Sequence, residues 1–136
     1  MKMNLKYTPL VVIFLFLVSG CSNKSQKQQQ QLVGNSKDDH GCLTSAGYRW
    51  SEAKKDCVRI WEVGTKVEAG EKHLFVVFSP DSTQAEIFAG SGKKLMCNQE
   101  EGKSVWIPSK GKNQVILSQK GLEVLFEGDT YQSVEK

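Results

Sequence analysis

The sequence is poor in the residue types on which most enzyme sites depend. It has only two histidines, His40 and His73, and neither belongs to a Cys-x-x-Cys or His-x-x-His pair of the kind that binds zinc. The chain also lacks the Gly-x-Ser-x-Gly motif of serine hydrolases and the glycine spacing of a phosphate-binding loop. No pair of carboxylates is singled out for glycosidase chemistry. We therefore predict no catalytic residues, no metal ligands and no cofactor.

Long apolar runs are missing as well. Leu10–Val18 holds nine consecutive apolar residues, whereas a membrane-spanning helix needs about 20. This run follows two lysines and precedes the small residues Ser19 and Gly20 and then Cys21. A basic head, a short apolar stretch and small residues are typical of a secretory signal, and the cysteine makes the pattern resemble the lipobox of bacterial lipoproteins. The resemblance implies a signal peptide at residues 1–20 and lipid chains on Cys21.

Lipidation of Cys21 predicts a protein that is held on an envelope membrane by its acyl chains. Ser22 follows the cysteine, where an aspartate would favour retention in the inner membrane. The next residues are basic and amide-rich rather than acidic. We therefore expect a lipid anchor in the outer membrane, with the protein facing the periplasm.

An excess of positive charge is also absent from the exported part. Removing Lys2 and Lys6 with the signal lowers the formal net charge from +3 to +1. Residues 41–136 contain 13 basic and 13 acidic side chains. A nucleic-acid partner is therefore not expected.

Residues 21–40 offer almost nothing to bury. The segment carries four consecutive glutamines, three lysines and several serines, which cannot offset the entropy of ordering the backbone. We predict that it is a disordered tether behind the lipidated cysteine. Residues 41–136 then form a single domain.

From Gly41 onward, short runs rich in Val, Ile, Phe and Trp alternate with turn residues about every 8–12 positions, which is typical of all-β folds. The pattern predicts a small antiparallel barrel or sandwich of about eight strands. The sequence also predicts one short helix, Ser51–Asp56, because Ser51 can cap it. The candidate strands are Val58–Glu62, Thr65–Ala69, His73–Ser79, Gln84–Ala89, Lys93–Asn98, Ser104–Ile107, Gln114–Gln119, Leu122–Glu127 and Thr130–Glu135.

Three cysteines remain once Cys21 is lipidated, so one must be left over. Cys42 and Cys57 are 15 positions apart, and we predict that they form a disulfide that staples an N-terminal hairpin or short helix. A loop of this size contributes about 3 kcal/mol in the chain-entropy model. Cys97 is then a buried small residue on its strand, with a bond to Cys42 or Cys57 as the alternative.

Two stretches are candidates for partner binding. Tyr48, Arg49 and Trp50 lie inside the cysteine loop, where the aromatic rings either belong to the core or form a recognition patch. Ser109, Lys110 and Lys112 lie in a polar stretch between two apolar strands. That stretch is either an ordinary surface loop or a projecting loop whose lysines enter an acidic cleft of a partner.

The string GYRWSEAKKDCVRIWEVG, followed by FVVFSPDSTQAEIF, resembles a family of small bacterial lipoproteins, notably of Bacteroides-like organisms, with the motif GYxWSx5CVRxxExG. The match extends from Cys42 to about Phe88. It implies a shared fold and leaves the activity open.

A second resemblance is carried by Val105-Trp106 followed by Ser109-Lys110-Gly111. This segment is similar to one in the membrane-bound inhibitors of C-type lysozyme, small lipoproteins folded as eight-stranded antiparallel barrels. The Ser-Ala-Ser-Gly-Ala-Arg-Tyr stretch of that family is absent here. The resemblance implies that a basic loop plugs the lysozyme cleft, whose two catalytic carboxylates attract basic groups.

Together these patterns predict a lipid-anchored envelope protein that is not an enzyme. Its domain is expected to be an all-β binding or envelope-maintenance module, whose partner is a protein or an envelope ligand. The alternative is a periplasmic lysozyme inhibitor.

Overall fold

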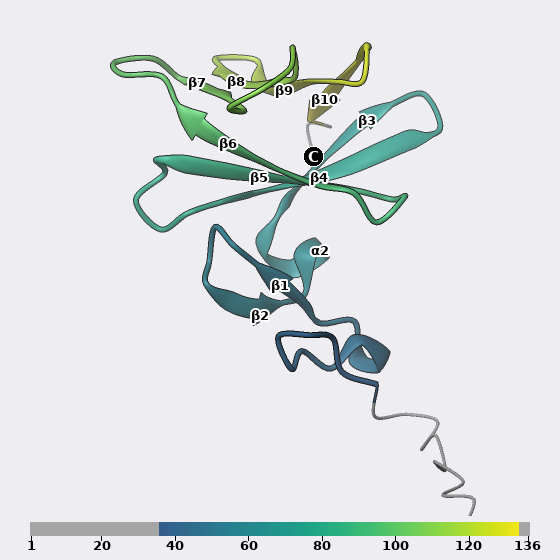
Figure 1. The fold of residues 1–136 in the computed structure, drawn as a ribbon. Helices are drawn as coiled ribbons and strands as arrows, with labels where there is room; N and C mark the ends of the chain where they lie inside the picture. Colours follow the sequence, from purple (N-terminus) through teal and green to yellow (C-terminus); the bar gives the residue numbers. More distant parts are fainter. Residues whose placement is uncertain (1–35, 134–136) are drawn as a thin grey trace, which may run out of the picture. The chain divides into compact units, whose positions relative to one another are not determined.

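The computed structural model describes residues 36–133. Eight strands form a closed antiparallel barrel, in which each strand pairs with the next along the chain and β10 pairs with β3 (Figure 1). The predicted all-β fold is confirmed, and of the two architectures left open the chain adopts the barrel. The barrel strands are β3 (Thr65–Ala69), β4 (Lys72–Phe78), β5 (Gln84–Ala89), β6 (Lys94–Gln99), β7 (Val105–Ile107), β8 (Gln114–Ser118), β9 (Gly121–Phe126) and β10 (Asp129–Ser133). Each begins within one residue of the start predicted for it.

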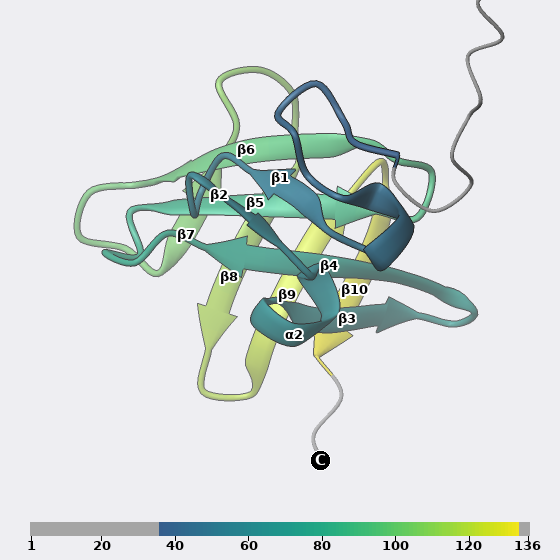
Figure 2. The same cartoon turned by 90° about the horizontal axis from the view of Figure 1, so that it is seen from below.

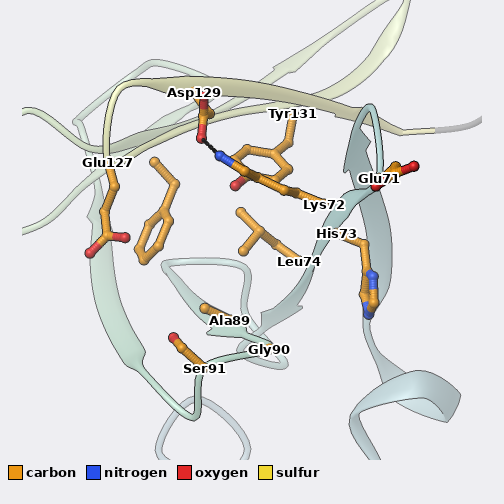
Figure 3. Close-up of a pocket in the computed structure, with 11 residues that line it drawn as sticks. Glu71, Lys72, His73, Leu74, Ala89, Gly90, Ser91, Glu127, Asp129 and Tyr131 are labelled. Atoms are coloured by element: carbon orange, nitrogen blue, oxygen red, sulfur yellow. Dashed lines mark hydrogen bonds and ion pairs between the residues drawn. The ribbon is translucent and has the colours of Figure 1, made fainter.

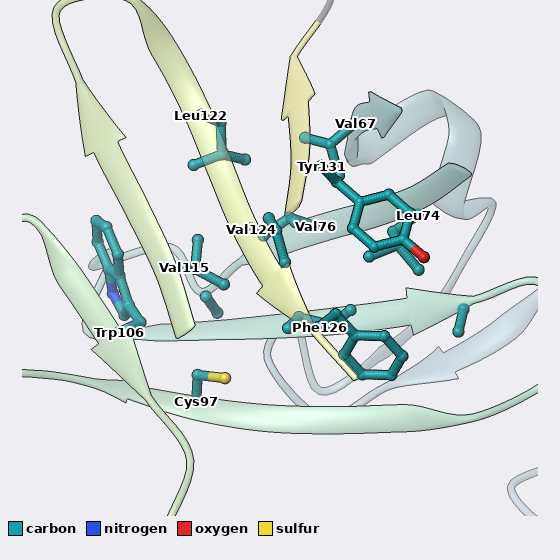
Figure 4. Packing of buried hydrophobic residues seen from close by; sticks show 13 residues of the cluster. Val67, Leu74, Val76, Cys97, Trp106, Val115, Leu122, Val124, Phe126 and Tyr131 are labelled. Carbon is teal, nitrogen blue, oxygen red and sulfur yellow. The ribbon is translucent and has the colours of Figure 1, made fainter. Parts of the chain in front are cut away.

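Side chains fill the interior of the barrel. Alternate residues of a strand point to the same face, and in β9 this places Leu122, Val124 and Phe126 inside. Trp106 reaches across the interior to meet the ring of Phe78 edge-on, with 4.9 Å between the ring centroids. The interior is thus a packed core (Figure 4), formed by Val67, Leu74, Val76, Ala85, Ile87, Ala89, Cys97, Trp106, Val115, Leu122, Val124, Phe126 and Tyr131.

The turn between β4 and β5 is held by one carboxylate. Oδ1 of Asp81 accepts hydrogen bonds from the hydroxyl of Ser79 at 2.6 Å and from the backbone amide and hydroxyl of Thr83 at 3.1 and 2.8 Å. These bonds lower the pKa of Asp81 to about 2, with the bond from Ser79 as the largest cause. The aspartate thus closes the connection between the two strands through side-chain and backbone donors on both sides of it.

Residues 36–64 form a separate layer, here named the N-terminal module. It contains the 3-10 helix η2 (Thr44–Ala46), the hairpin β1 (Arg49–Ser51) and β2 (Asp56–Val58), and the one-turn helix α2 (Ile60–Val63). The predicted disulfide joins Cys42 to Cys57. Two views show the hairpin lying against the side of the barrel that β4 and β5 form (Figures 1 and 2).

Glu86 fastens the N-terminal module to the barrel. It points outward from β5 but is only 2% exposed, because the module covers it. Its Oε2 accepts a 2.7 Å hydrogen bond from the Ser51 hydroxyl and a 3.3 Å bond from the amide of Ala53. Val77 and Phe88, also on the outer faces of β4 and β5, are fully buried. The outer faces of β4 and β5 are therefore apolar at these two positions because the N-terminal module covers them.

Two predicted elements of the N-terminal module are wrong. Ser51–Asp56 is a hairpin turn, not a helix, because Ser51 pairs with Asp56 and Lys55 adopts a left-handed conformation with φ of 54°. The strand predicted at Val58–Glu62 ends at Val58 and is followed by α2. A 3.1 Å ion pair between Arg59 and Glu62, one helical turn apart, fits the helical conformation.

The predicted signal peptide, Cys21 and most of the predicted tether lie outside the described residues. Residues 36–40, at the end of that tether, belong to the N-terminal module and contact the rest of it. Lys37 forms a β-bridge with Leu43, and Asp38 accepts a 2.8 Å hydrogen bond from the amide of Cys42. These contacts make residues 36–40 part of the folded unit.

Candidate binding site at the barrel mouth

Four connections meet at one end of the barrel. Consecutive strands run in opposite directions, so every second connection lies at the same end. Connections 70–71, 90–93, 108–113 and 127–128 therefore share an end, which we call the barrel mouth.

The turn 127–128 ties these connections together. Lys93 pairs with Glu127 at 2.6 Å, and Lys72 pairs with Asp129 at 2.7 Å. The side-chain oxygen of Asn113 accepts a 2.9 Å hydrogen bond from the amide of Glu127. The hydrogen bond from Lys72 to Asp129 raises the pKa of the lysine. Connections 90–93 and 108–113 are thus linked to the β9–β10 turn, and the first residues of β4 and β10 are linked to each other.

The predicted loop residues Ser109, Lys110 and Lys112 lie at the barrel mouth, in the connection between β7 and β8. All three are exposed. Lys110 and Lys112 have no ion-pair partner within residues 36–133, whereas Lys72 and Lys93 at the same end are both paired. This loop therefore presents two positive charges without an ion-pair partner in the described chain. Its last residue, Asn113, is held in place by the hydrogen bond from the Glu127 amide.

A cavity of about 400 Å³ opens at the barrel mouth (Figure 3). Its floor is the outermost layer of the core, formed by Leu74, Ala89, Phe126 and Tyr131. Charged side chains, among them the Lys72–Asp129 pair, border it. The volume falls within the range of small-ligand pockets, and the combination of an apolar floor with a polar border is typical of them.

The second predicted set, Tyr48, Arg49 and Trp50, lies in the N-terminal module. The guanidinium of Arg59 lies 4.8 Å from the centroid of the Tyr48 ring. The Trp50 ring stacks on His40 at 4.7 Å, and its Nε1 donates a 2.8 Å hydrogen bond to Glu52. Both rings are half-buried and make these contacts inside the N-terminal module, whereas Arg49 is exposed. No hydrogen bond or ion pair of the described residues joins this set to Ser109, Lys110 or Lys112.

The structure gives a role to four residues of the GYRWS stretch: Gly47, Tyr48, Trp50 and Ser51. Each of these residues contacts another part of the N-terminal module or the barrel. Glu86, the partner of Ser51, was not recognised from the sequence. The sequence did contain a sign of its role, which is a single carboxylate inside the otherwise apolar run QAEIFA. A carboxylate that is buried in such a strand needs hydrogen-bond donors from elsewhere in the protein.

Cys97 is the free cysteine of the described chain, as predicted, and it is completely buried in the core. Burial raises the pKa of its thiol to about 11. Among residues 36–133, no group of three or more His, Cys, Asp or Glu side chains could hold a metal ion. No helix in the same range is long and apolar enough to cross a membrane.

Comparisons with protein-family models, with curated proteins and with solved structures found no match for this chain.

Proposed function

We propose that the protein is a non-enzymatic binding module of the bacterial envelope, anchored by lipid on Cys21, that binds an acidic partner at its barrel mouth. The observation that carries this proposal is the pair of exposed lysines, Lys110 and Lys112, which have no ion-pair partner in the described chain. Unpaired charges at a protein surface steer oppositely charged partners and raise their association rate.

The packing of the barrel supports a binding role over catalysis. Its interior is occupied by apolar side chains, so a substrate could not be enclosed inside the barrel; the mouth holds the cavity described above. There, Lys72, Lys93, Glu127 and Asp129 neutralise one another in two ion pairs. Side chains that are held in ion pairs are less available to donate or accept a proton. The two pairs therefore favour a binding role over acid–base catalysis.

Inhibition of a lysozyme is the second candidate function. The eight-stranded antiparallel barrel is the fold that the resemblance to C-type lysozyme inhibitors implied. The loop with Ser109 and Lys110 lies at one end of that barrel, where it is accessible to an enzyme cleft. Two carboxylates in such a cleft would attract the free lysines.

Neutralising the two lysines tests the proposed surface. We expect the double variant Lys110→Gln/Lys112→Gln to recover its envelope partner from detergent extracts less efficiently than the wild-type chain. Lys120→Gln is the matched control, because Lys120 is also exposed and has no ion-pair partner within residues 36–133. Equal recovery by the double variant would overturn the role assigned to this loop.

A turbidity assay of cell-wall lysis separates the two candidate functions. The purified protein is added to C-type, G-type and I-type lysozymes in turn. Inhibition of one class, lost in the double lysine variant, supports the inhibitor. No inhibition at micromolar protein removes that candidate and leaves the binding module with another envelope partner.

The anchor is tested by membrane fractionation. Cys21→Ser removes the sulfur that would carry the lipid, and the chain should then move from the membrane fraction to the soluble fraction of the envelope. Mass spectrometry of the wild-type chain should show an acylated Cys21 at the N-terminus. A wild-type chain that is soluble and unmodified would contradict the anchor.

A further inference from the structure

Among the four residues that form the floor of the mouth cavity, Tyr131 is the one with a polar side-chain atom. The residue is only 5% exposed, because its ring packs in the core. Its hydroxyl is turned toward the cavity (Figure 3) and has no hydrogen-bond partner within residues 36–133. A phenol donates one hydrogen bond and also accepts. A deeply placed group of this kind, without a partner in the protein, is suited to a bound molecule.

The charges around the cavity do not select a charged ligand. Lys72 is paired with Asp129, and Glu127 is paired with Lys93. Glu71, which also lines the cavity, has no ion-pair partner within residues 36–133, but its side chain is exposed, so its charge stays hydrated and is screened by solvent. An ionic group that entered the cavity would therefore lose its hydration for little compensating attraction, which is costly. A neutral group meets no such penalty.

The remaining wall is apolar. Leu74 and Phe126 are 3% and 6% exposed, and Ala89 leaves space above them because its side chain is a single methyl group. A compact apolar group placed there would displace water from these side chains, which is favourable in proportion to the area covered. Ser91, which also lines the cavity, adds a hydroxyl at its border.

We propose that the mouth cavity binds a small, uncharged amphipathic molecule. Its apolar part contacts Leu74, Ala89 and Phe126, and a hydroxyl or carbonyl group forms a hydrogen bond with Tyr131. This site is distinct from the lysine loop and does not require the acidic partner proposed above. The two can therefore fail or succeed independently.

Three probes with a similar phenylalkyl body and different polar ends test the charge preference: 2-phenylethanol, 2-phenylethylamine and 3-phenylpropionate. Each is titrated at neutral pH into the isotopically labelled protein, and the amide resonances are followed by NMR. We expect the alcohol to bind most tightly, with the largest shifts at Gly90, Ser91 and Gly128. Tighter binding by either charged probe, or no shift of these amides by any probe at millimolar concentration, would overturn the proposal.

Tyr131→Phe tests the hydrogen bond while it keeps the ring in the core. A hydrogen bond contributes about 0.5–1.5 kcal/mol, so the affinity for 2-phenylethanol should fall between about twofold and tenfold. Tyr48→Phe is the matched control, since it removes the same hydroxyl from the N-terminal module. Unchanged affinity in Tyr131→Phe would refute the assigned role.

Ala89→Val provides a second variant that does not alter Tyr131. The two added methyl groups reduce the space above Leu74 and Phe126, so binding of all probes should be lost. The amide spectrum reports whether each variant is folded. If folded Ala89→Val binds the alcohol as the wild type does, the ligand does not occupy this cavity and the proposal fails.

Discussion

Gly47 is constrained by its own backbone and by a neighbouring ring. Its φ of 82° lies in the left-handed region, where a side chain costs about 1–2 kcal/mol. A Cβ atom at this position would also lie 2.2 Å from Cη2 of Trp61. The glycine of the GYxWS motif therefore allows both the turn after η2 and the packing of α2 on that turn.

Gly47→Ala should lower the free energy of unfolding by more than the backbone cost alone. Gly92→Ala is the control, because Gly92 has a similar φ of 84° and no atom near its would-be Cβ. The difference between the two variants should be about 1 kcal/mol, the low end of the cost of overpacking, because the Trp61 ring is 54% exposed and can shift part of the way. Urea denaturation measures both values, and equal losses would show that Trp61 moves aside freely.

Glu86 illustrates the same dependence on a distant residue. Glu86→Ala leaves the Ser51 hydroxyl and the Ala53 amide buried without their acceptor, which should cost about 1–3 kcal/mol in the free energy of unfolding. Glu86→Gln keeps one acceptor oxygen and should lose less. Glu123→Ala, at a partly exposed carboxylate of β9, should change stability little. If Glu86→Ala matched that control in urea denaturation, the fastening role would be refuted.

The hairpin β1–β2 is an element too small to hold its own shape. It has three paired positions, and isolated two-stranded hairpins are marginal in water. The hairpin is stabilised by the disulfide between Cys42 and Cys57 and by the contact with Glu86. The barrel strands, in contrast, are stabilised by neighbours on both sides.

Replacement of Cys42 and Cys57 by alanine should therefore loosen the N-terminal module before the barrel. The loop of 15 residues predicts a loss of about 3 kcal/mol. Hydrogen exchange should accelerate in Arg49–Val58 and stay slow in β5 and β9. Equal acceleration in the barrel strands would show that the module and the barrel unfold as one unit. The circular dichroism of the barrel serves as the control for retained fold.

Closure of the barrel makes the Cys97 thiol unreactive, because it buries the thiol in the core. The thiol lies inside the closed sheet, and its pKa rises from the usual 9.0 to about 11. Since the folded state favours the protonated form, its contribution to stability is complete below pH 9. That contribution is lost as the pH rises through about 11.

The wild-type free energy of unfolding should thus fall between pH 9 and pH 11 by roughly 2–3 kcal/mol more than that of Cys97→Ala. Denaturation at a series of pH values gives both curves, and subtraction cancels every contribution that the two chains have in common. Parallel curves would contradict the shift. In the native protein at pH 8, iodoacetamide should leave Cys97 unmodified until denaturant is added.

The sequence by itself determined the strands, because each barrel strand is bounded by local turn chemistry such as Ser79 with Asp81. It also favoured the Cys42–Cys57 pairing, since these two cysteines are 15 positions apart, although it left a bond of Cys97 to either of them open. Only the tertiary structure decided the barrel over the sandwich, because both architectures bury the same alternating residues. It also decided the conformation of residues 51–56, because the hydrogen-bond acceptor of Ser51 and Ala53 is Glu86, more than 30 positions away in the chain. The mouth cavity, with Tyr131 beside Leu74 and Ala89, exists because closure brings β4, β5 and β10 to a common end.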